Sequence, residues 1–143
     1  MNSSYKNDVC FGDLIASTTF IKKPKTIVEI GILQGYSLQK FIENAPDADI
    51  IAYDIFDKFN GNHANKDELT EKFNSYKNVK INYGDFYEIY NNLNDNSIDL
   101  LHIDVANNGQ IYDFVFQNYI QKMTQNGLTV SYTHLTLPTT PYV

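Results

Sequence analysis

A short stretch near the N-terminus, residues 26–37 with the sequence TIVEIGILQGYS, constrains the fold more than any other part of the chain. It begins as an apolar run that contains one acid, continues through a turn with two glycines, and ends in polar residues that suit the start of a helix. In a parallel α/β sheet, a strand, turn and helix in this order meet at the carboxyl edge, where nucleotide-like ligands bind. The stretch therefore predicts the first strand of such a sheet and one wall of a ligand site.

The rest of the chain alternates between short apolar runs and segments with helical periodicity. This pattern predicts strands over residues 26–30, 50–54, 79–83 and 98–105, a fifth strand from Leu128, and helices over about 7–22, 37–44, 67–76, 86–93 and 110–123. We expect Asn126 and Gly127 to end the last helix. Strands that alternate with helices favour a doubly wound, mostly parallel, Rossmann-like α/β sheet.

Most of the predicted helices have an apolar face that we expect to lie against the sheet. The inward residues should be Phe11, Leu14, Ile15 and Thr18 in the first helix, Leu38, Phe41 and Ile42 in the second, Leu69, Phe73 and Tyr76 in the third, and Ile111, Phe114, Val115, Asn118 and Tyr119 in the last. Between these elements, residues 55–65 are polar and irregular. That stretch is either a cover for a substrate or a plain surface loop.

Composition limits the class of partner. The net charge is −6, and the eleven basic residues are all lysines that form no cluster, which argues against nucleic acid as a partner. No apolar stretch approaches the ~20 residues that a membrane span needs, and the N-terminus does not resemble a signal peptide. The single cysteine, Cys10, cannot form an internal disulfide. These observations predict a cytoplasmic protein that binds a small molecule rather than a membrane.

The glycine turn does not match the fingerprint of nicotinamide dinucleotide-binding proteins. That fingerprint requires G-x-G-x-x-G, and when it is started at Gly31 its second and third glycines fall on Leu33 and Tyr36. A Rossmann oxidoreductase that uses a nicotinamide cofactor is therefore disfavoured, although it stays open as an alternative. A degenerate domain without catalytic activity is the other alternative.

The turn instead reads E-x-G-x-x-x-G, from Glu29 through Gly31 to Gly35. This resembles motif I of class I S-adenosylmethionine-dependent methyltransferases, in which an acid precedes G-x-G-x-G, with Leu33 in place of the middle glycine. With Ser37 included, the turn is similar to E-I-G-x-x-x-G-x-S of the small-molecule O-methyltransferases related to macrocin O-methyltransferase and to cephalosporin-hydroxylase-like proteins. The resemblance implies that these four matching residues form the cofactor site, where glycines let the backbone approach the ligand.

The resemblance extends to the acids that follow the second and third predicted strands. Asp54 matches the family's acid that accepts hydrogen bonds from the ribose hydroxyls of S-adenosylmethionine, and otherwise it is a solvated acid at a strand end. Asp85 matches the acid near the adenine amino group, with Phe86 beside the ring. Asp85 can also serve as the N-cap of the helix predicted over 86–93.

The end of the fourth predicted strand, His102 to Asp104, matches the family's reaction edge. The resemblance implies that Asp104 acts as the general base toward a hydroxyl of a small-molecule acceptor, or binds a Mg²⁺ ion that lowers the pKa of that hydroxyl. Asn107 or Asn108 could supply a second oxygen ligand. We expect His102 to be a buried histidine with a satisfied hydrogen bond rather than a catalytic residue.

Residues 130–143, VSYTHLTLPTTPYV, contain two of the four prolines and neither an acid nor a lysine. The sequence VSYTHLTLPT matches the translation of a sequencing-library adapter read through in one frame. We therefore expect a leading helix in residues 1–25, a partial S-adenosylmethionine-binding domain in 26–129, incomplete at its C-terminal end, and a non-native tail in 130–143. A genuine C-terminal strand and turn is the alternative for the tail. The fragment is expected to be inactive by itself.

Overall fold

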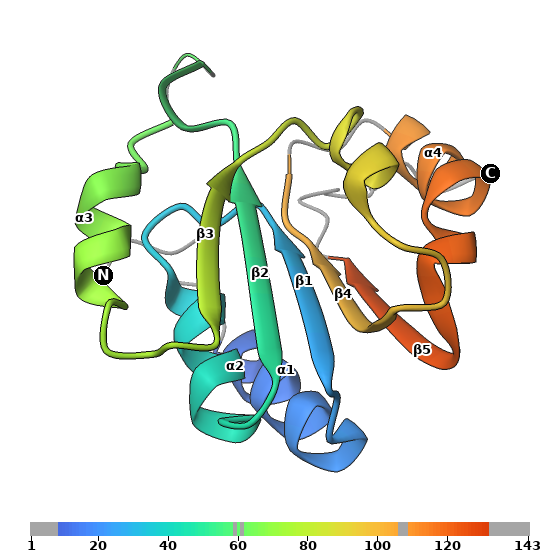
Figure 1. The fold of residues 1–143 in the computed structure, drawn as a ribbon, viewed down its shortest axis with the longest axis horizontal. Helices are drawn as coiled ribbons and strands as arrows, with labels where there is room; N and C mark the ends of the chain where they lie inside the picture. Colours follow the sequence, from blue (N-terminus) through green and yellow to red (C-terminus); the bar gives the residue numbers. More distant parts are fainter. Residues whose placement is uncertain (1–8, 59, 61, 106–108, 132–143) are drawn as a thin grey trace, which may run out of the picture.

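The computed structural model describes residues 9–58, 60, 62–105 and 109–131, and contains one sheet of five strands (Figure 1). The strands are β1 (Thr26–Ile30), β2 (Asp49–Asp54), β3 (Val79–Tyr83), β4 (Ile98–Ile103) and β5 (Met123–Ser131). Their order in the sheet is β3-β2-β1-β4-β5, and all four pairings are parallel. The chain thus builds outward from β1 in one direction and then returns to build in the other. This confirms the predicted doubly wound, Rossmann-like α/β sheet.

Helices cover both faces of the sheet. The α-helices are α1 (Val9–Lys22), α2 (Tyr36–Asn44), α3 (Lys66–Lys72) and α4 (Gln110–Asn118), and the 3₁₀ turns are η1 (Phe56–Lys58), η2 (Ile89–Asn92) and η3 (Ile120–Lys122). One hydrophobic core joins α1, α2 and α3 to one face of the sheet. A second core joins η2 and α4 to the opposite face. The strands between them are nearly continuous apolar runs because both of their faces are buried.

The register of the central strands brings the predicted site residues to one edge of the sheet. Ile30 pairs with Tyr53 of β2 and with Ile103 of β4. The hydrogen bonds between the strands continue one residue beyond the ends of β1 and β4. The amide of Gly31 donates to the carbonyl of Tyr53 at 2.8 Å, and the amide of Asp104 donates to the carbonyl of Ile30 at 2.8 Å. The carboxyl ends of β1, β2 and β4 therefore lie level with one another, at the point where the strand order reverses.

Left-handed backbone conformations shape the turn after β1. Gly31 has φ 90° and Gly35 has φ 75°, and both conformations favour glycine. A Cβ atom on Gly35 would also lie 2.7 Å from the ring of Phe73, so this glycine lets the turn pack against the end of α3. Leu33 lies at the family's middle glycine position and adopts φ 49° despite its side chain. A non-glycine residue in this conformation is strained and needs support from its surroundings.

Several predicted boundaries are wrong near the third and fourth helices. Helix α3 ends at Lys72, and Tyr76 beyond it is 38% exposed rather than inward. The helix predicted over 86–93 is only the 3₁₀ turn η2.

In the first helix, the apolar Leu14 is exposed and the polar Thr19 is buried, with its hydroxyl donating to the carbonyl of Ile15 at 2.7 Å. Helical periodicity alone did not capture that satisfied hydroxyl.

The helix predicted over 110–123 ends at Asn118, and the fifth strand begins earlier than expected. Residues 126 and 127 do not cap a helix, since they lie inside β5, which starts at Met123. Between the pairs Ile98–Met123 and Leu100–Leu128 the register shifts, so the strand bulges here. A Cβ atom on Gly127 would lie 2.9 Å from the carbonyl oxygen of Ile98. That glycine serves a close approach of two strands.

Strand β5 continues through Val130 and Ser131, which pair with His102 and Ile103. The remaining residues of the predicted tail, 132–143, lie outside the described residues, as do Asn107 and Asn108. Within the described part of the chain, no helix has the length and hydrophobicity that crossing a membrane requires.

Candidate functional site

A cavity of about 410 Å³ opens at the carboxyl edge of the sheet, between the ends of β1, β2, β3 and β4. Five residues predicted for the site line it, namely Gly31, Asp54, Asp85, Phe86 and Asp104. Three of these five residues are acids, and none of the described lining residues is basic. The volume falls within the range of small-molecule sites, and the cluster of carboxylates favours a ligand that carries positive charge.

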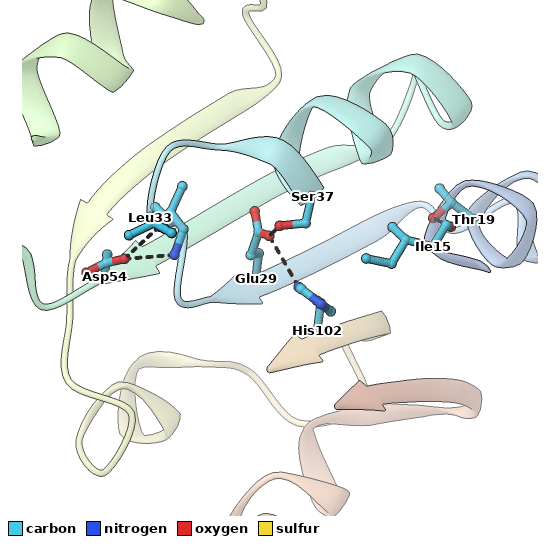
Figure 2. Close-up of polar contacts among 8 residues, drawn as sticks. Ile15, Thr19, Glu29, Leu33, Ser37, Asp54 and His102 are labelled. Atoms are coloured by element: carbon cyan, nitrogen blue, oxygen red, sulfur yellow. Dashed lines mark hydrogen bonds and ion pairs between the residues drawn. The ribbon is translucent and has the colours of Figure 1, made fainter. Parts of the chain in front are cut away.

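Asp54 is the most extensively hydrogen-bonded acid of the cavity. Its Oδ2 atom accepts from the amides of Ile32 at 2.7 Å and Leu33 at 3.2 Å, in the turn after β1 (Figure 2). Its Oδ1 atom accepts from the amide of Phe56 and from the side-chain amide of Asn62, both at 2.7 Å. The residue is 6% exposed. Asp54 is therefore not a solvated acid at a strand end. Its carboxylate connects the turn after β1 to the loop after β2 through hydrogen bonds to both.

Asp85 and Phe86 form the wall of the cavity that follows β3. The Oδ1 atom of Asp85 accepts from the amide of Tyr87 at 2.8 Å, which makes a local turn rather than the N-cap of an α-helix. Phe86 is 4% exposed and stacks on Tyr119, with ring centroids 5.3 Å apart and an interplanar angle of 11°. The hydroxyl of Tyr119 donates to the carbonyl of Phe86 at 2.6 Å. One face of the Phe86 ring is thus occupied by the protein itself.

Asp104 lies where β4 reaches the cavity and is partly exposed there. Magnesium requires several oxygen ligands, of which this carboxylate could be one. In the described part of the chain, however, no three His, Cys, Asp or Glu side chains are grouped so that they could hold a metal ion. The described residues therefore do not support the predicted Mg²⁺ site, and Asn107 and Asn108 lie outside them.

Glu29 and Ser37 contact each other (Figure 2), and neither is among the described residues that line the cavity. The hydroxyl of Ser37 donates to the Oε1 atom of Glu29, and Nδ1 of His102 lies 3.2 Å from the same oxygen. Glu29 and His102 are fully buried, and the ring of Phe41 meets the His102 ring edge-on at 5.4 Å. Burial raises the pKa of Glu29, and the contacts with His102 and Ser37 oppose that rise only in part. His102 is thus buried with a polar partner, as predicted.

Gly35 also lies away from the cavity, since it packs against the ring of Phe73. Of the four residues that match the motif, Glu29, Gly31, Gly35 and Ser37, only Gly31 is among the described residues that line the cavity. Sequence reasoning missed other lining residues, among them Leu33, Asn62 and Tyr87. Asn62 follows no motif, because its contact with Asp54 depends on how the loop after β2 folds back. Tyr87 adjoins the predicted pair Asp85 and Phe86, so its position in that turn was the available signal.

Solved structures share this fold. A proposed caffeoyl-CoA O-methyltransferase from Staphylococcus aureus is 25% identical, with a TM-score of 0.68 over 87% of this chain and 57% of its own. A methyltransferase from Podospora anserina bound to SAH is 22% identical, with a TM-score of 0.67 over 92% of this chain and 53% of its own. The O-methyltransferase TomG from Streptomyces achromogenes, involved in tomaymycin synthesis and complexed with SAM, is 16% identical, with a TM-score of 0.62 over 85% and 54%.

This chain therefore spans little more than half the length of those three proteins. No curated protein matches its sequence. The sequence model of one family, described as a methyltransferase domain, matches residues 28–131. That range runs from β1 to the end of β5 and includes every described residue of the cavity wall. The chain thus belongs to the methyltransferase-domain family.

Proposed function

We propose that this chain binds S-adenosylmethionine in the cavity and that the protein transfers its methyl group to a hydroxyl of a small molecule. The observation that carries the proposal is the set of acids at the strand ends, Asp54, Asp85 and Asp104, around a cavity without a basic residue among its described lining. S-adenosylmethionine carries a positive sulfonium, which carboxylates attract in a partly desolvated site. A nicotinamide dinucleotide carries a negative pyrophosphate, which the same carboxylates repel.

When bound, S-adenosylmethionine would supply an electrophilic methyl group. Asp104, at the reaction edge, would take the proton of the acceptor hydroxyl. The oxygen of that hydroxyl would form a bond to the methyl group as the bond between sulfur and the methyl carbon breaks. Asp85 would accept from the adenine amino group, and Asp54 would bind the ribose hydroxyls. No residue of the chain forms a covalent bond in this scheme. Most of the rate enhancement comes from holding donor and acceptor in line.

Glu29, Gly35 and Ser37 support the site from below in this proposal. They fix the turn after β1, whereas the backbone of Gly31 reaches the cavity itself. The expected acceptor class is a sugar or another natural product, in line with the similarity to the motif of macrocin O-methyltransferase relatives. The fold shared with TomG, an O-methyltransferase of tomaymycin synthesis, supports this class.

Calorimetric titration of the 143-residue chain with S-adenosylhomocysteine tests the cofactor, with NADH titrated in parallel. We expect S-adenosylhomocysteine to bind, NADH not to bind, and Asp85→Ala to weaken S-adenosylhomocysteine binding about tenfold, the size of one charge-assisted hydrogen bond. Asp47→Ala is the matched control, because Asp47 is an exposed acid outside the cavity. Binding of NADH in place of S-adenosylhomocysteine would favour the oxidoreductase alternative. Binding of neither would favour a degenerate domain.

We also infer that residues 130–143 are foreign to the protein and that the fragment lacks part of the acceptor site. The match of VSYTHLTLPT to a translated adapter supports the first statement, and the coverage of 53–57% of the three solved proteins supports the second. A methyl-transfer assay tests the second statement: we expect the fragment to be inactive and a longer chain from the same locus to be active. One contiguous genomic read that encodes the tail would contradict its foreign origin.

A further inference from the structure

We propose that Asn62 occupies, in the free protein, the place on the Asp54 carboxylate that a ribose hydroxyl takes when the cofactor binds. Cofactor binding would therefore exchange one donor for another at the Oδ1 atom of Asp54. This inference rests on the proposed function, and it assigns to Asn62 a role in setting the affinity for ligands with ribose hydroxyls.

The carboxylate of Asp54 has no acceptor site to spare. An ionised carboxylate offers about four lone-pair positions, two on each oxygen. Four donors already meet them at 2.7 to 3.2 Å, namely the amides of Ile32, Leu33 and Phe56 and the side chain of Asn62. A hydroxyl that binds Asp54 must therefore displace one of these donors.

Three of the four donors are backbone amides that cannot leave without moving an element. Ile32 and Leu33 belong to the turn after β1, which is held where the amide of Gly31 donates to the carbonyl of Tyr53 and the amide of Gly35 donates to the carbonyl of Ile32. Phe56 is the first residue of η1, two residues after Asp54. Asn62 is the only one of the four that donates through a side chain, so rotation about its χ angles suffices to release it.

Asn62 also lies where an incoming ligand must pass. It lines the cavity together with Asp54, so a ligand that approaches the Oδ1 atom from the cavity meets its side chain. Its own Oδ1 atom accepts from the amide of Ala64 at 2.9 Å, which holds the side chain in place before a ligand arrives. A donor held by its own backbone competes with a ligand more strongly than free water does. Asn62 should therefore weaken the recognition of ribose hydroxyls.

The test compares S-adenosylhomocysteine with its 2′-deoxy and 3′-deoxy analogues, each titrated calorimetrically into wild type, Asn62→Ala and Asn62→Ser. In both variants the amide of Phe56 still donates to the Oδ1 atom of Asp54, and water takes the place of the Asn62 side chain there, because serine is too short to replace asparagine. We expect the preference for S-adenosylhomocysteine over at least one deoxy analogue to grow about three- to tenfold in both variants. Asn74→Ala is the control, since Asn74 is exposed beyond α3 and outside the cavity, and it should leave the preference unchanged.

Two other outcomes overturn the inference. If the variants lose affinity for all three ligands by the same factor, Asn62 merely holds Asp54 in place. If the preference is unchanged, Asn62 and the hydroxyl do not compete. Failure of the wild-type chain to bind S-adenosylhomocysteine contradicts the proposed function instead. Urea unfolding of each variant, measured in parallel, separates altered recognition from a loss of folded protein.

Discussion

A Cβ atom on Gly31 would overlap the carbonyl oxygen of Asp104 and lie 2.8 Å from its carbonyl carbon. The turn after β1 and the end of β4 therefore touch backbone to backbone at the rim of the cavity. Sequence reasoning attributed this glycine to the approach of a cofactor. The structure supplies a requirement within the fold as well, since the two strand ends can meet at this distance only without a side chain between them.

Gly31→Ala should cost much more stability than Gly109→Ala. Both glycines have φ 90°, a conformation that strains any L side chain, so both alanines suffer a backbone penalty of about 1–2 kcal/mol. Gly31 adds an overlap with backbone atoms, whereas no described atom beyond its chain neighbours lies within 4 Å of a Cβ atom on Gly109. We expect Gly31→Ala to lower the free energy of unfolding by at least about 3 kcal/mol in urea titrations. Equal losses in the two variants would show that the overlap is relieved at little cost.

Asp54→Asn should destabilise the chain even in the absence of a ligand. The asparagine NH₂ group would face two of the four donors that now meet a carboxylate oxygen, and buried donors without an acceptor are costly. We expect a loss of about 2–4 kcal/mol in the free energy of unfolding. Asp57→Asn, at an exposed acid of η1, is the control. A change of less than about 0.5 kcal/mol in Asp54→Asn would mean that the four hydrogen bonds contribute little.

The carboxyl ends of β1, β2 and β3 were predictable from local sequence, whereas β4 ends at Ile103 rather than at the predicted residue 105, and β5 begins at Met123 rather than at Leu128. Apolar runs bounded by Gly and Asp placed β3 at residues 79–83 without error, and the parallel order then brought Asp54 and Asp104 to one edge. The helix ends were less predictable, because α4 ends at Asn118 and α3 at Lys72 without a glycine or proline to mark the end, and their C-caps are Tyr119 and Phe73. Propensity is a weak guide wherever tertiary contacts override it.

The division of the site between cavity and support was not predictable from the motif. Glu29 and Gly31 are two residues apart, so their side-chain positions lie on the same face of the strand and its extension. Glu29 is nevertheless buried against His102 of the neighbouring strand, and Gly31 reaches the cavity because the chain turns there. The burial of Glu29 depends on the register between β1 and β4, which pairs Glu29 with His102. These two residues are 73 positions apart in the sequence, so no local motif records the pairing.

Tyr119→Phe should loosen the wall that carries Phe86. The Tyr119 hydroxyl is buried and donates to the Phe86 carbonyl at 2.6 Å, while the ring stacks on Phe86. Removal of the hydroxyl keeps the ring and leaves that carbonyl without this donor, at a cost of about 1 kcal/mol. Tyr112→Phe, on the exposed side of α4, should change the free energy of unfolding by less than about 0.5 kcal/mol. Equal urea midpoints for the two variants would contradict a contribution from the hydrogen bond.

Glu29→Gln should remove a pH dependence of stability that the wild type has above pH 4.5. Burial raises the pKa of Glu29 above its usual value of 4.5, so over this interval the folded chain holds a proton that the unfolded chain has lost. Stability then falls as the pH rises from 4.5 and levels off above the folded-state pKa. Glutamine keeps an oxygen to accept from Ser37 and does not titrate. The free energy of unfolding of Glu29→Gln should therefore rise relative to that of the wild type as the pH rises. Urea titrations from pH 4.5 to 9 measure that difference, and Glu43→Gln, at an exposed acid, is the control. A constant difference between wild type and Glu29→Gln would mean that Glu29 has the same pKa in both states, because its contacts with His102 and Ser37 then offset burial in full.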